Sequence, residues 1–426
     1  MSSKEFFLIL LDNIRLYIVI FIGVLSLMSI VLRKKIHSIT DPLLIALVMV
    51  SFANSVPIFL YALNQISYEK FNFFVISETL FWSGYSLFAR NKIDMFDSTR
   101  ETMTFRETYR FFLFSVCCIV ILQLLCYSIG GIPIFSSSRF SSRQIPIVAI
   151  MNRVMIFPKF MCWVFVYHLI LNKHIHYKKK ILAYITMSIL IAFSVLAGSK
   201  GFILNALYSY FIYQYMYKGE SPEIKWKYIL IVILSPLLVI SVYYKSNNTM
   251  DGFITLISRF VGSGDCYWMG FGNDVIDYIN NNAHWYERVF SFILGPLGLI
   301  SSNAKTPIGT LILNEINPGT VGLLEGPNSR LPIFSWACFG YGGVIFSLLC
   351  GMLFAIMAYR KLFSIPRGIV GASLAGLMYI NAITMDTDIT LCLSGLIDIL
   401  FGMLLVNVYS LAFCKGIGRI KIAKRN

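Results

Sequence analysis

The stretch IRLYIVIFIGVLSLMSIVL, residues 14–32, decides the class of fold because it is almost wholly apolar and carries a single charged residue, Arg15. A run of about 20 apolar residues is long enough to cross the hydrocarbon core of a bilayer as a helix. The residues before it lack the basic start and the small-residue cleavage site of a signal peptide. We therefore expect this run to remain in the protein as a transmembrane helix.

The composition extends this conclusion to the whole chain. Hydrophobic residues make up 57% of it and charged residues 13%, and the formal net charge is +15. Soluble domains carry about 25% charged residues, so the sequence predicts an integral membrane protein. In such a protein the positive charge indicates topology, and we do not interpret it as a signal of nucleic-acid binding.

Apolar runs recur along the chain, separated by short polar turns. They predict an all-α integral membrane protein, a single polytopic domain over residues 1–426 with about eleven transmembrane helices. The expected spans are 14–32, 42–63, 73–89, 111–129, 154–172, 181–198, 201–217, 228–245, 331–359, 368–385 and 389–413.

The basic residues predict the orientation of these spans. Most of the 36 Lys and Arg residues lie in alternate turns and in the tail, and such turns face the cytoplasm. They are 33–41, 90–110, 173–180, 218–227, 360–367 and the tail from Lys415. The N-terminus is then expected outside and the C-terminus in the cytoplasm.

Two longer polar segments fall on the outer side in this topology. The smaller one covers residues 130–153, and the larger one covers 245–330 and includes SRFVGSGDCYWMGFGND, NNNAHWYERVF and NPGTVGLLEGPNSR. We expect short helices in the larger loop. No phosphate-binding loop of the GxxxxGK[ST] kind is present in the sequence, which disfavours chemistry driven by ATP.

Basic residues on the outer side run against the general charge bias, so we interpret them as a site for an anion. Arginine binds phosphate through a rigid fork of donors, and at the outer membrane surface this suits an anionic lipid headgroup or a lipid diphosphate. The alternative is that these residues pair with Asp251, Asp265, Glu287 or Glu315, or with phospholipid headgroups. The basic set is Arg139, Arg143, Arg153, Lys200, Arg259, Arg288 and Arg330.

Two groups in the larger loop are candidates for a general base. His284 precedes Glu287 and Arg288 by three and four residues, so on a helix the three would share one face. They would then serve as base, orienter of the base and phosphate clamp. The alternative for His284 is a surface histidine on an amphipathic helix. Asp265 lies among glycines that allow close approach of a ligand, and its alternative is an exposed turn residue. Tyr267, Trp268 and Trp285 supply ring faces for sugar.

Carboxylates also occur within or beside the apolar segments. Glu78 and Asp398 fall inside predicted spans, where a carboxylate is costly and faces a cavity or a partner. They are the main argument for a transporter. Asp386 and Asp388 form an Asp-x-Asp pair, but we expect Asp388 to be the N-cap of the last helix. We therefore predict no metal ion.

The pattern resembles the O-antigen polymerases of Gram-negative bacteria. Ala197-Gly-Ser-Lys-Gly201 is similar to a Gly-Ser-Arg/Lys-Gly turn of that family, and the glycine-rich return segment FSWACFGYGGVIFSLLCGMLFA is similar in character. Arg259 and Gly270 fit an Arg-x10-Gly spacing described in some members. Arg288 and Arg330 each meet a glycine one residue early, which puts that motif in doubt at both positions.

The resemblance implies a function, a location and partners. A polymerase would sit in the bacterial inner membrane with both loops periplasmic, and would join repeat units carried on undecaprenyl diphosphate. The sugar–diphosphate bond supplies the energy, so no cofactor is expected. Membrane lipids and a chain-length regulator protein would be partners. Two other functions remain open, an O-antigen ligase and a lipid-linked oligosaccharide flippase.

Overall fold

The computed structural model describes residues 1–90, 103–135, 145–198, 202–222, 260–279, 282–295, 297–320, 326–359 and 367–413. Within these ranges the protein is helical and contains no strand. Seven helical segments are long and apolar enough to cross a membrane. This confirms an all-α membrane protein and leaves the expected count of eleven spans unconfirmed. The seven are Ile14–Leu32, Pro42–Ala62, Phe105–Phe135, Pro146–Leu171, Tyr177–Leu196, Leu331–Tyr359 and Ile389–Ala412.

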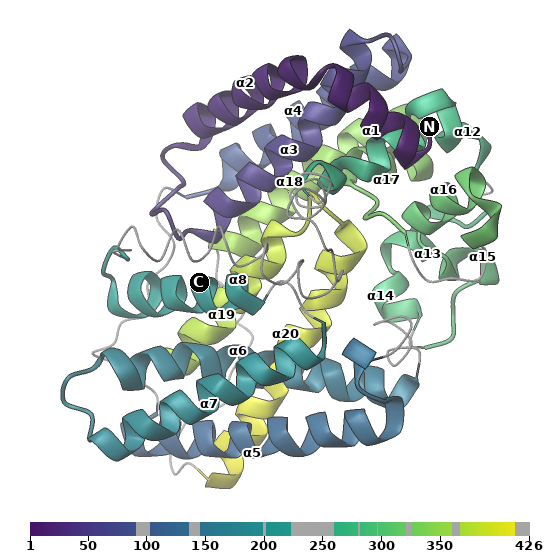
Figure 1. Cartoon of the computed structure of the whole chain (residues 1–426). Coiled ribbons are helices and arrows are strands. Elements are labelled where there is room, and N and C mark those ends of the chain that lie inside the picture. Colours follow the sequence, from purple (N-terminus) through teal and green to yellow (C-terminus); the bar gives the residue numbers. More distant parts are fainter. Residues whose placement is uncertain are drawn as a thin grey trace, which may run out of the picture.

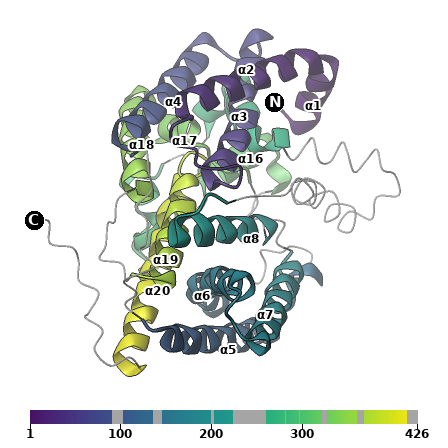
Figure 2. The ribbon, with the colours of Figure 1, turned by 90° about the vertical axis from the view of Figure 1, so that its left-hand side faces the viewer.

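The long helices form two groups joined by a connecting pair (Figures 1 and 2). One group contains α2 (Ile14–Leu32), α3 (Pro42–Ala62), α4 (Tyr68–Phe88) and α18 (Gly343–Tyr359). The other contains α5 (Phe105–Gly130), α6 (Pro146–Leu171) and α7 (Tyr177–Leu196). The pair α19 (Ile369–Ile383) and α20 (Ile389–Phe413) packs on α6, and α19 also packs on α18.

Besides 331–359, three expected spans differ in the structure. The segment 73–89 belongs to α4, which is long enough but is not among the seven apolar candidates. The segment 201–217 is a short α8 (Phe202–Phe211) followed by a wider π-helical turn, η4 (Ile212–Lys218). The segment 368–385 is the 15-residue α19. The segment 228–245 lies outside the described residues.

The close packing of α4 on α18 depends on glycine. A Cβ on Gly84 would meet the backbone of Leu348, and one on Gly351 would meet the backbone of Phe81. Such small residues let two membrane helices approach closely enough for many dispersion contacts. The hydroxyl groups of Ser77 and Ser347 are 2.6 Å apart at the same interface.

The segment 331–359 is a helical hairpin, although its sequence predicts one long span. Helix α17 (Leu331–Phe339) ends at a 3-10 turn, η8 (Gly340–Gly342), in which Gly340 has φ +53°. The hydroxyl oxygens of Ser335 and Ser347 are 3.3 Å apart. In a continuous helix these two residues would be about 18 Å apart, so α17 folds back on α18.

The described part of the larger loop is folded into short helices at one end of the bundle, on the right in Figure 1. The N-terminal α1 (Ser3–Asp12) packs here, and its Phe6 ring stacks on Trp268 with ring centroids 4.0 Å apart. The N-terminus and this loop therefore lie on the same side. The short elements are η5 (Gly262–Gly264), α11 (Asp265–Gly270), η6 (Gly272–Asp274), α12 (Val275–Tyr278), α13 (Trp285–Val289), α14 (Ser291–Leu294), α15 (Ser302–Lys305), α16 (Ile308–Ile316) and η7 (Pro318–Thr320). In the smaller loop the structure describes η2 (Pro133–Phe135).

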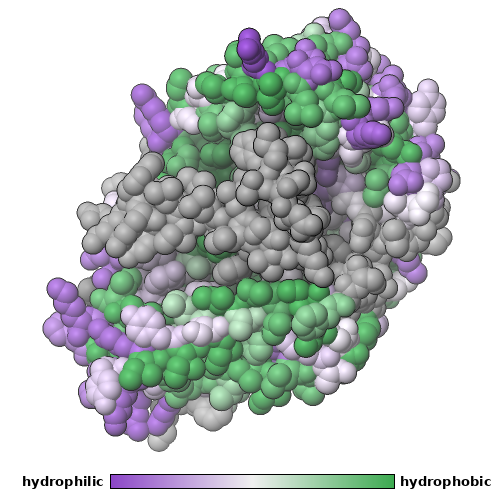
Figure 3. All heavy atoms as spheres, viewed as in Figure 1, coloured by the Kyte–Doolittle hydropathy of each residue, from purple (hydrophilic) through white to green (hydrophobic). Residues whose placement is uncertain are grey.

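Basic turns gather at the opposite end of the bundle. The ammonium group of Lys35 donates to the carbonyl of Ala89, and that of Lys179 lies 4.6 Å from the ring centroid of Phe105. The first contact joins the turn 33–41 to the end of α4, and the second joins the turn 173–180 to the start of α5. Figure 3 shows hydrophilic residues at the lower left and upper right ends and hydrophobic residues along the helices between them.

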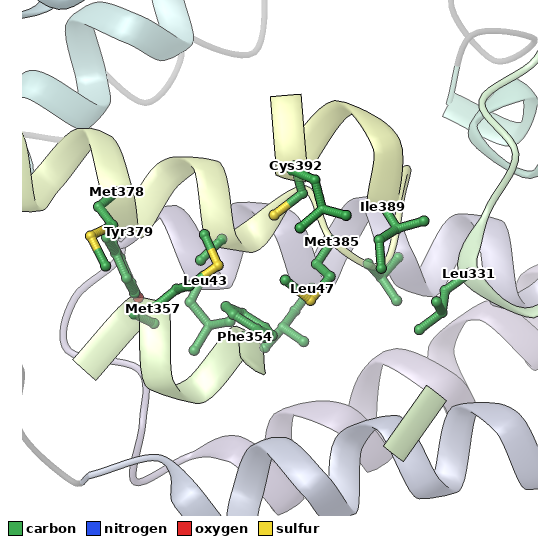
Figure 4. Close-up of a cluster of buried hydrophobic side chains, with 14 of the residues drawn as sticks. Leu43, Leu47, Leu331, Phe354, Met357, Met378, Tyr379, Met385, Ile389 and Cys392 are labelled. Atoms are coloured by element: carbon green, nitrogen blue, oxygen red, sulfur yellow. The ribbon is translucent and has the colours of Figure 1, made fainter. Parts of the chain in front are cut away.

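The core lies where α3, α18, α19 and α20 meet (Figure 4). Leu47, Phe354 and Met385 are each almost completely buried there. Leu331 and Ile389 continue this apolar layer toward the start of α17. The layer excludes water from the polar groups that lie beside it.

Candidate functional site

A buried polar cluster joins the larger loop to the bundle. We call Asn54, Glu78, Tyr267, Arg330 and Asp386 the Arg330 cluster; all five are buried. They come from α3, α4, α11, the residue before α17, and the turn between α19 and α20. Five segments that are distant in sequence thus meet at one point.

The backbone places Arg330 beside Asp386. Arg330 has φ +38°, a left-handed conformation that is uncommon for a residue with a side chain. Its amide donates to the carbonyl of Thr387 at 3.1 Å, and the amide of Leu331 donates to that of Asp386 at 2.9 Å. The turn between α19 and α20 therefore satisfies the first amides of α17, which have no partner within their own helix.

The Arg330 guanidinium is then held by two segments, the turn between α19 and α20 and the loop. Its Nη1 lies 3.0 Å from Asp386 Oδ2 in an ion pair whose side chains are 1% and 2% exposed. Its Nε donates to the carbonyl of Ser263 at 2.9 Å, which brings in the loop. Burial raises the pKa of Asp386, and the nearby Arg330 charge opposes that rise. Removing either residue of the pair would leave the other charge buried without a partner, which would strongly destabilise the protein.

Glu78 joins the cluster from α4. Its Oε2 accepts hydrogen bonds from Asn54 Nδ2 at 2.8 Å and from Trp82 Nε1 at 3.0 Å. The Tyr267 hydroxyl donates to Asn54 Oδ1 at 3.4 Å. Burial raises the pKa of Tyr267, so this phenol remains a neutral donor. Asn54 therefore bridges the loop and the carboxyl group of Glu78.

The segment 284–288 lies elsewhere on the loop, where His284, Glu287 and Arg288 each contact neighbouring groups of the loop. His284 is exposed, and its ring stacks on Tyr286 with centroids 5.2 Å apart. The Glu287 carboxylate accepts from the backbone amides of His284 and Ser301, and the bond from Ser301 lowers the pKa of Glu287. Glu287 thus contacts the amide of His284 and fixes the loop.

Arg288 is buried and donates to the carbonyls of Ala304 and Thr306. Both acceptors belong to the same loop, so the guanidinium ties α13 to the turn after α15. The structure therefore gives Arg288 a stabilising role within the loop.

Asp265 and the three predicted aromatic residues lie in different surroundings. Asp265 is half-buried, and its Oδ1 accepts from the amide of Cys266. Tyr267 and Trp268 are buried in the core, where Phe6 covers one face of the Trp268 ring. Trp285 is 49% exposed. Of these three rings, only that of Trp285 offers an open face.

The glycines beside Asp265 also have different roles. A Cβ on Gly264 would meet the carbonyl oxygen of Ala53 at 2.9 Å, whereas one on Gly262 would meet nothing within 4 Å. The close approach at Gly264 is therefore an approach of the loop to helix α3.

Further ionic contacts lie between the long helices. Arg153 of α6 lies 3.3 Å from Asp398 of α20, and it also donates to the hydroxyl of Ser394 at 2.8 Å. Lys159 of α6 donates to Gln123 of α5 at 2.7 Å. The intramembrane carboxylate Asp398 thus has a basic partner, which the sequence had assigned to a diphosphate. The remaining predicted basic residues, Arg139, Arg143, Lys200 and Arg259, lie outside the described residues.

Sequence reasoning found the members of the Arg330 cluster separately and missed their association. Glu78 carried a signal because it interrupts an apolar span, while Asn54 carried none. Asp388 is confirmed as the N-cap of α20, since its Oδ1 accepts from the amides of Thr390 and Leu391. Comparison with protein-family models, curated proteins and solved structures finds no match to this chain.

Proposed function

We propose that the protein is an O-antigen polymerase, a membrane glycosyltransferase that transfers a growing glycan from undecaprenyl diphosphate to the sugar of a new lipid-linked repeat unit. The observation that carries this proposal is a folded loop, docked on one end of a helical membrane bundle, that exposes His284 and Trp285. A lipid-linked oligosaccharide has its diphosphate at the membrane surface, so its sugars would lie beside such a loop.

The charge pattern supplies the orientation for this proposal. The turns rich in Lys and Arg face the cytoplasm by the positive-inside rule. The loop lies at the other end of the bundle together with the N-terminus, so both are periplasmic in a bacterial inner membrane. The C-terminus is then cytoplasmic. A chain-length regulator protein is an expected partner.

The proposed chemistry needs cationic groups for the donor diphosphate, whose charge grows as the glycan leaves. We assign this role to Arg153, whose side chain stays 37% exposed although it pairs with Asp398, and to Arg139, Arg143, Lys200 and Arg259, which lie outside the described residues. Arg288 and Arg330 already bond to protein acceptors, so we assign both to holding the loop. Fixed cationic donors of this kind stabilise a leaving diphosphate without a cofactor.

The acceptor needs a base and a binding surface. His284 would remove the proton of the acceptor hydroxyl, because its exposed imidazole can reach a substrate and histidine is the commonest general base in enzymes. Asp265 is the alternative base. The open ring of Trp285 would contact the CH groups of a sugar.

Deletion of the gene in a strain that makes long O-antigen tests the proposal. A polymerase predicts lipopolysaccharide capped with a single repeat unit, and restoration of long chains by the wild-type gene. Loss of all O-antigen with lipid-linked units held on the cytoplasmic side would replace the proposal with a flippase. Accumulation of full-length chains that are not attached to lipid A-core would replace it with a ligase.

The flippase is the second candidate because of one observation. Arg153 and Asp398 place an ion pair between α6 and α20, and ionic groups between membrane helices often mark a transport path. In proteoliposomes, movement of a fluorescent lipid-linked oligosaccharide across the bilayer without chain growth would favour this function.

A further inference from the structure

Two oxygen atoms of the Arg330 cluster have an unusual environment. Glu78 Oε1 and Asp386 Oδ1 are buried and have no hydrogen-bond donor among the described residues. Yet the two carboxyl groups lie within hydrogen-bonding range of each other. Two ionised carboxylates would present only acceptors to one another at this point.

The other oxygens of the same groups are well supplied with donors. Glu78 Oε2 accepts from Asn54 and Trp82, and Asp386 Oδ2 accepts from Arg330. Arg330 therefore balances the charge of Asp386. A second buried negative charge on Glu78 would have only neutral donors, which do not offset the loss of water around a charge.

Among the described residues, the groups that face the pair supply no second cation. They are the Arg330 guanidinium, the Tyr267 phenol from α11, the Asn54 amide from α3 and the Trp82 indole from α4 itself. The Cys266 thiol is a further ionisable group, adjacent to Tyr267. A proton shared by the two oxygens would give both of them a partner and leave one negative charge to balance that of Arg330.

We propose that Glu78 and Asp386 form a proton-binding site in which a protonated Glu78 donates to Asp386 Oδ1. This proton fastens α4 to the turn between α19 and α20, and through Arg330 and Ser263 it fastens the loop to the bundle. Removal of the proton leaves two carboxylates facing one guanidinium, so the contact between α4 and the turn becomes repulsive. The site goes beyond the proposed polymerase function and is independent of it.

Infrared difference spectroscopy on the purified full-length protein in detergent tests the proton directly. We expect the absorption of a protonated carboxylic acid at neutral pH, and its loss in Glu78→Gln. Glu69→Gln is the matched control, because it makes the same change on the same helix at an exposed position. A wild-type spectrum without this absorption at neutral pH, or an absorption that persists in Glu78→Gln, would overturn the proposal.

Thermal unfolding as a function of pH gives a second readout. A proton that is bound in the folded state and released on unfolding makes stability fall as pH rises above the ordinary range of glutamic acid, about 4.3. We expect wild type and Glu69→Gln to lose stability over this range and Glu78→Gln to lose this dependence. An unchanged dependence in Glu78→Gln would contradict a shared proton, and if that variant does not accumulate, the wild-type spectrum decides.

Discussion

The larger loop contains two buried arginines, Arg288 and Arg330, that bond to different parts of the protein. Arg330 is 1% exposed and pairs with Asp386, which is 56 positions away in sequence. Arg288 contacts the carbonyls of Ala304 and Thr306 in its own loop, close to the exposed His284.

The two residues are of the same type, so their different roles follow from where their partners lie along the chain. Because its partners are distant in sequence, Arg330 fastens the loop to the bundle, and we call this contact the joint. In the segment 284–288, Glu287 and Arg288 bond to groups of the loop, His284 is exposed, and the Trp285 ring lies beside Phe339 of α17. Changes at the joint should therefore unseat the loop, and changes at the surface should affect only binding or chemistry.

The largest effect is expected at the joint. Arg330→Met leaves Asp386 charged and buried without its partner, which costs about 3–5 kcal/mol. We expect the variant to accumulate poorly and to unfold at a lower temperature in detergent.

The double variant Arg330→Met/Asp386→Leu is the control for this change. Replacing both charges by apolar side chains removes the unpaired charge, so it should recover much of the lost stability. A single variant as stable as wild type would contradict the assignment of Arg330 as a joint.

The next effect is expected at the surface, on rate and not on stability. His284→Ala removes the proposed base, and loss of a general base lowers rates about 10²–10⁴-fold. Stability should change by less than about 0.5 kcal/mol, because the side chain is exposed. Polymer yield and thermal unfolding on the same preparation check both halves, and normal chain growth in this variant would shift the role to Asp265.

Substitutions at Gly264 and Gly262 test whether the loop packs against helix α3. Gly264→Val places a side chain against Ala53 and Val56 of α3, and overpacking of this kind costs about 1–3 kcal/mol. Gly262→Val, two residues away, meets open space and should have a smaller effect. Equal losses of thermal stability in the two variants would show that the loop does not dock on α3 as described.

The smallest effect is expected at Trp285. Its ring is half exposed, so Trp285→Ala should leave stability unchanged. Loss of a ring contact worth about 0.5–1.5 kcal/mol should raise the KM for the acceptor up to about tenfold. Trp285→Phe keeps a ring and should restore most of the binding; an unaltered KM in Trp285→Ala would remove this residue from the site.

The sequence predicted the parts of the fold that depend on local composition. Runs such as 14–32 and 42–63 are helices because their apolar length alone favours a membrane span. The hairpin at 331–359 was missed, because the segment stays apolar across its turn. The three glycines at 340, 342 and 343 were the available signal for that break.

The site was less predictable because it is made of long-range contacts. Glu78 belongs to α4 and Asp386 to the turn between α19 and α20, and nothing local indicates that they meet at Arg330. The sequence predicted that the Trp268 ring binds sugar. It could not indicate that Phe6 covers this ring, because Phe6 is more than 200 residues away in sequence. Asp388 was predictable because a helix cap is a local interaction.

Reconstitution in liposomes tests the proposed polymerase activity directly. The purified protein in liposomes is given a single lipid-diphosphate-linked oligosaccharide, and the lengths of the lipid-linked products are determined. We expect lipid-linked glycans of many different lengths, each a multiple of the repeat unit. They should form without nucleotide, and their yield should be strongly reduced in His284→Ala. Products that remain one repeat unit long with the folded wild-type protein would contradict the proposed activity.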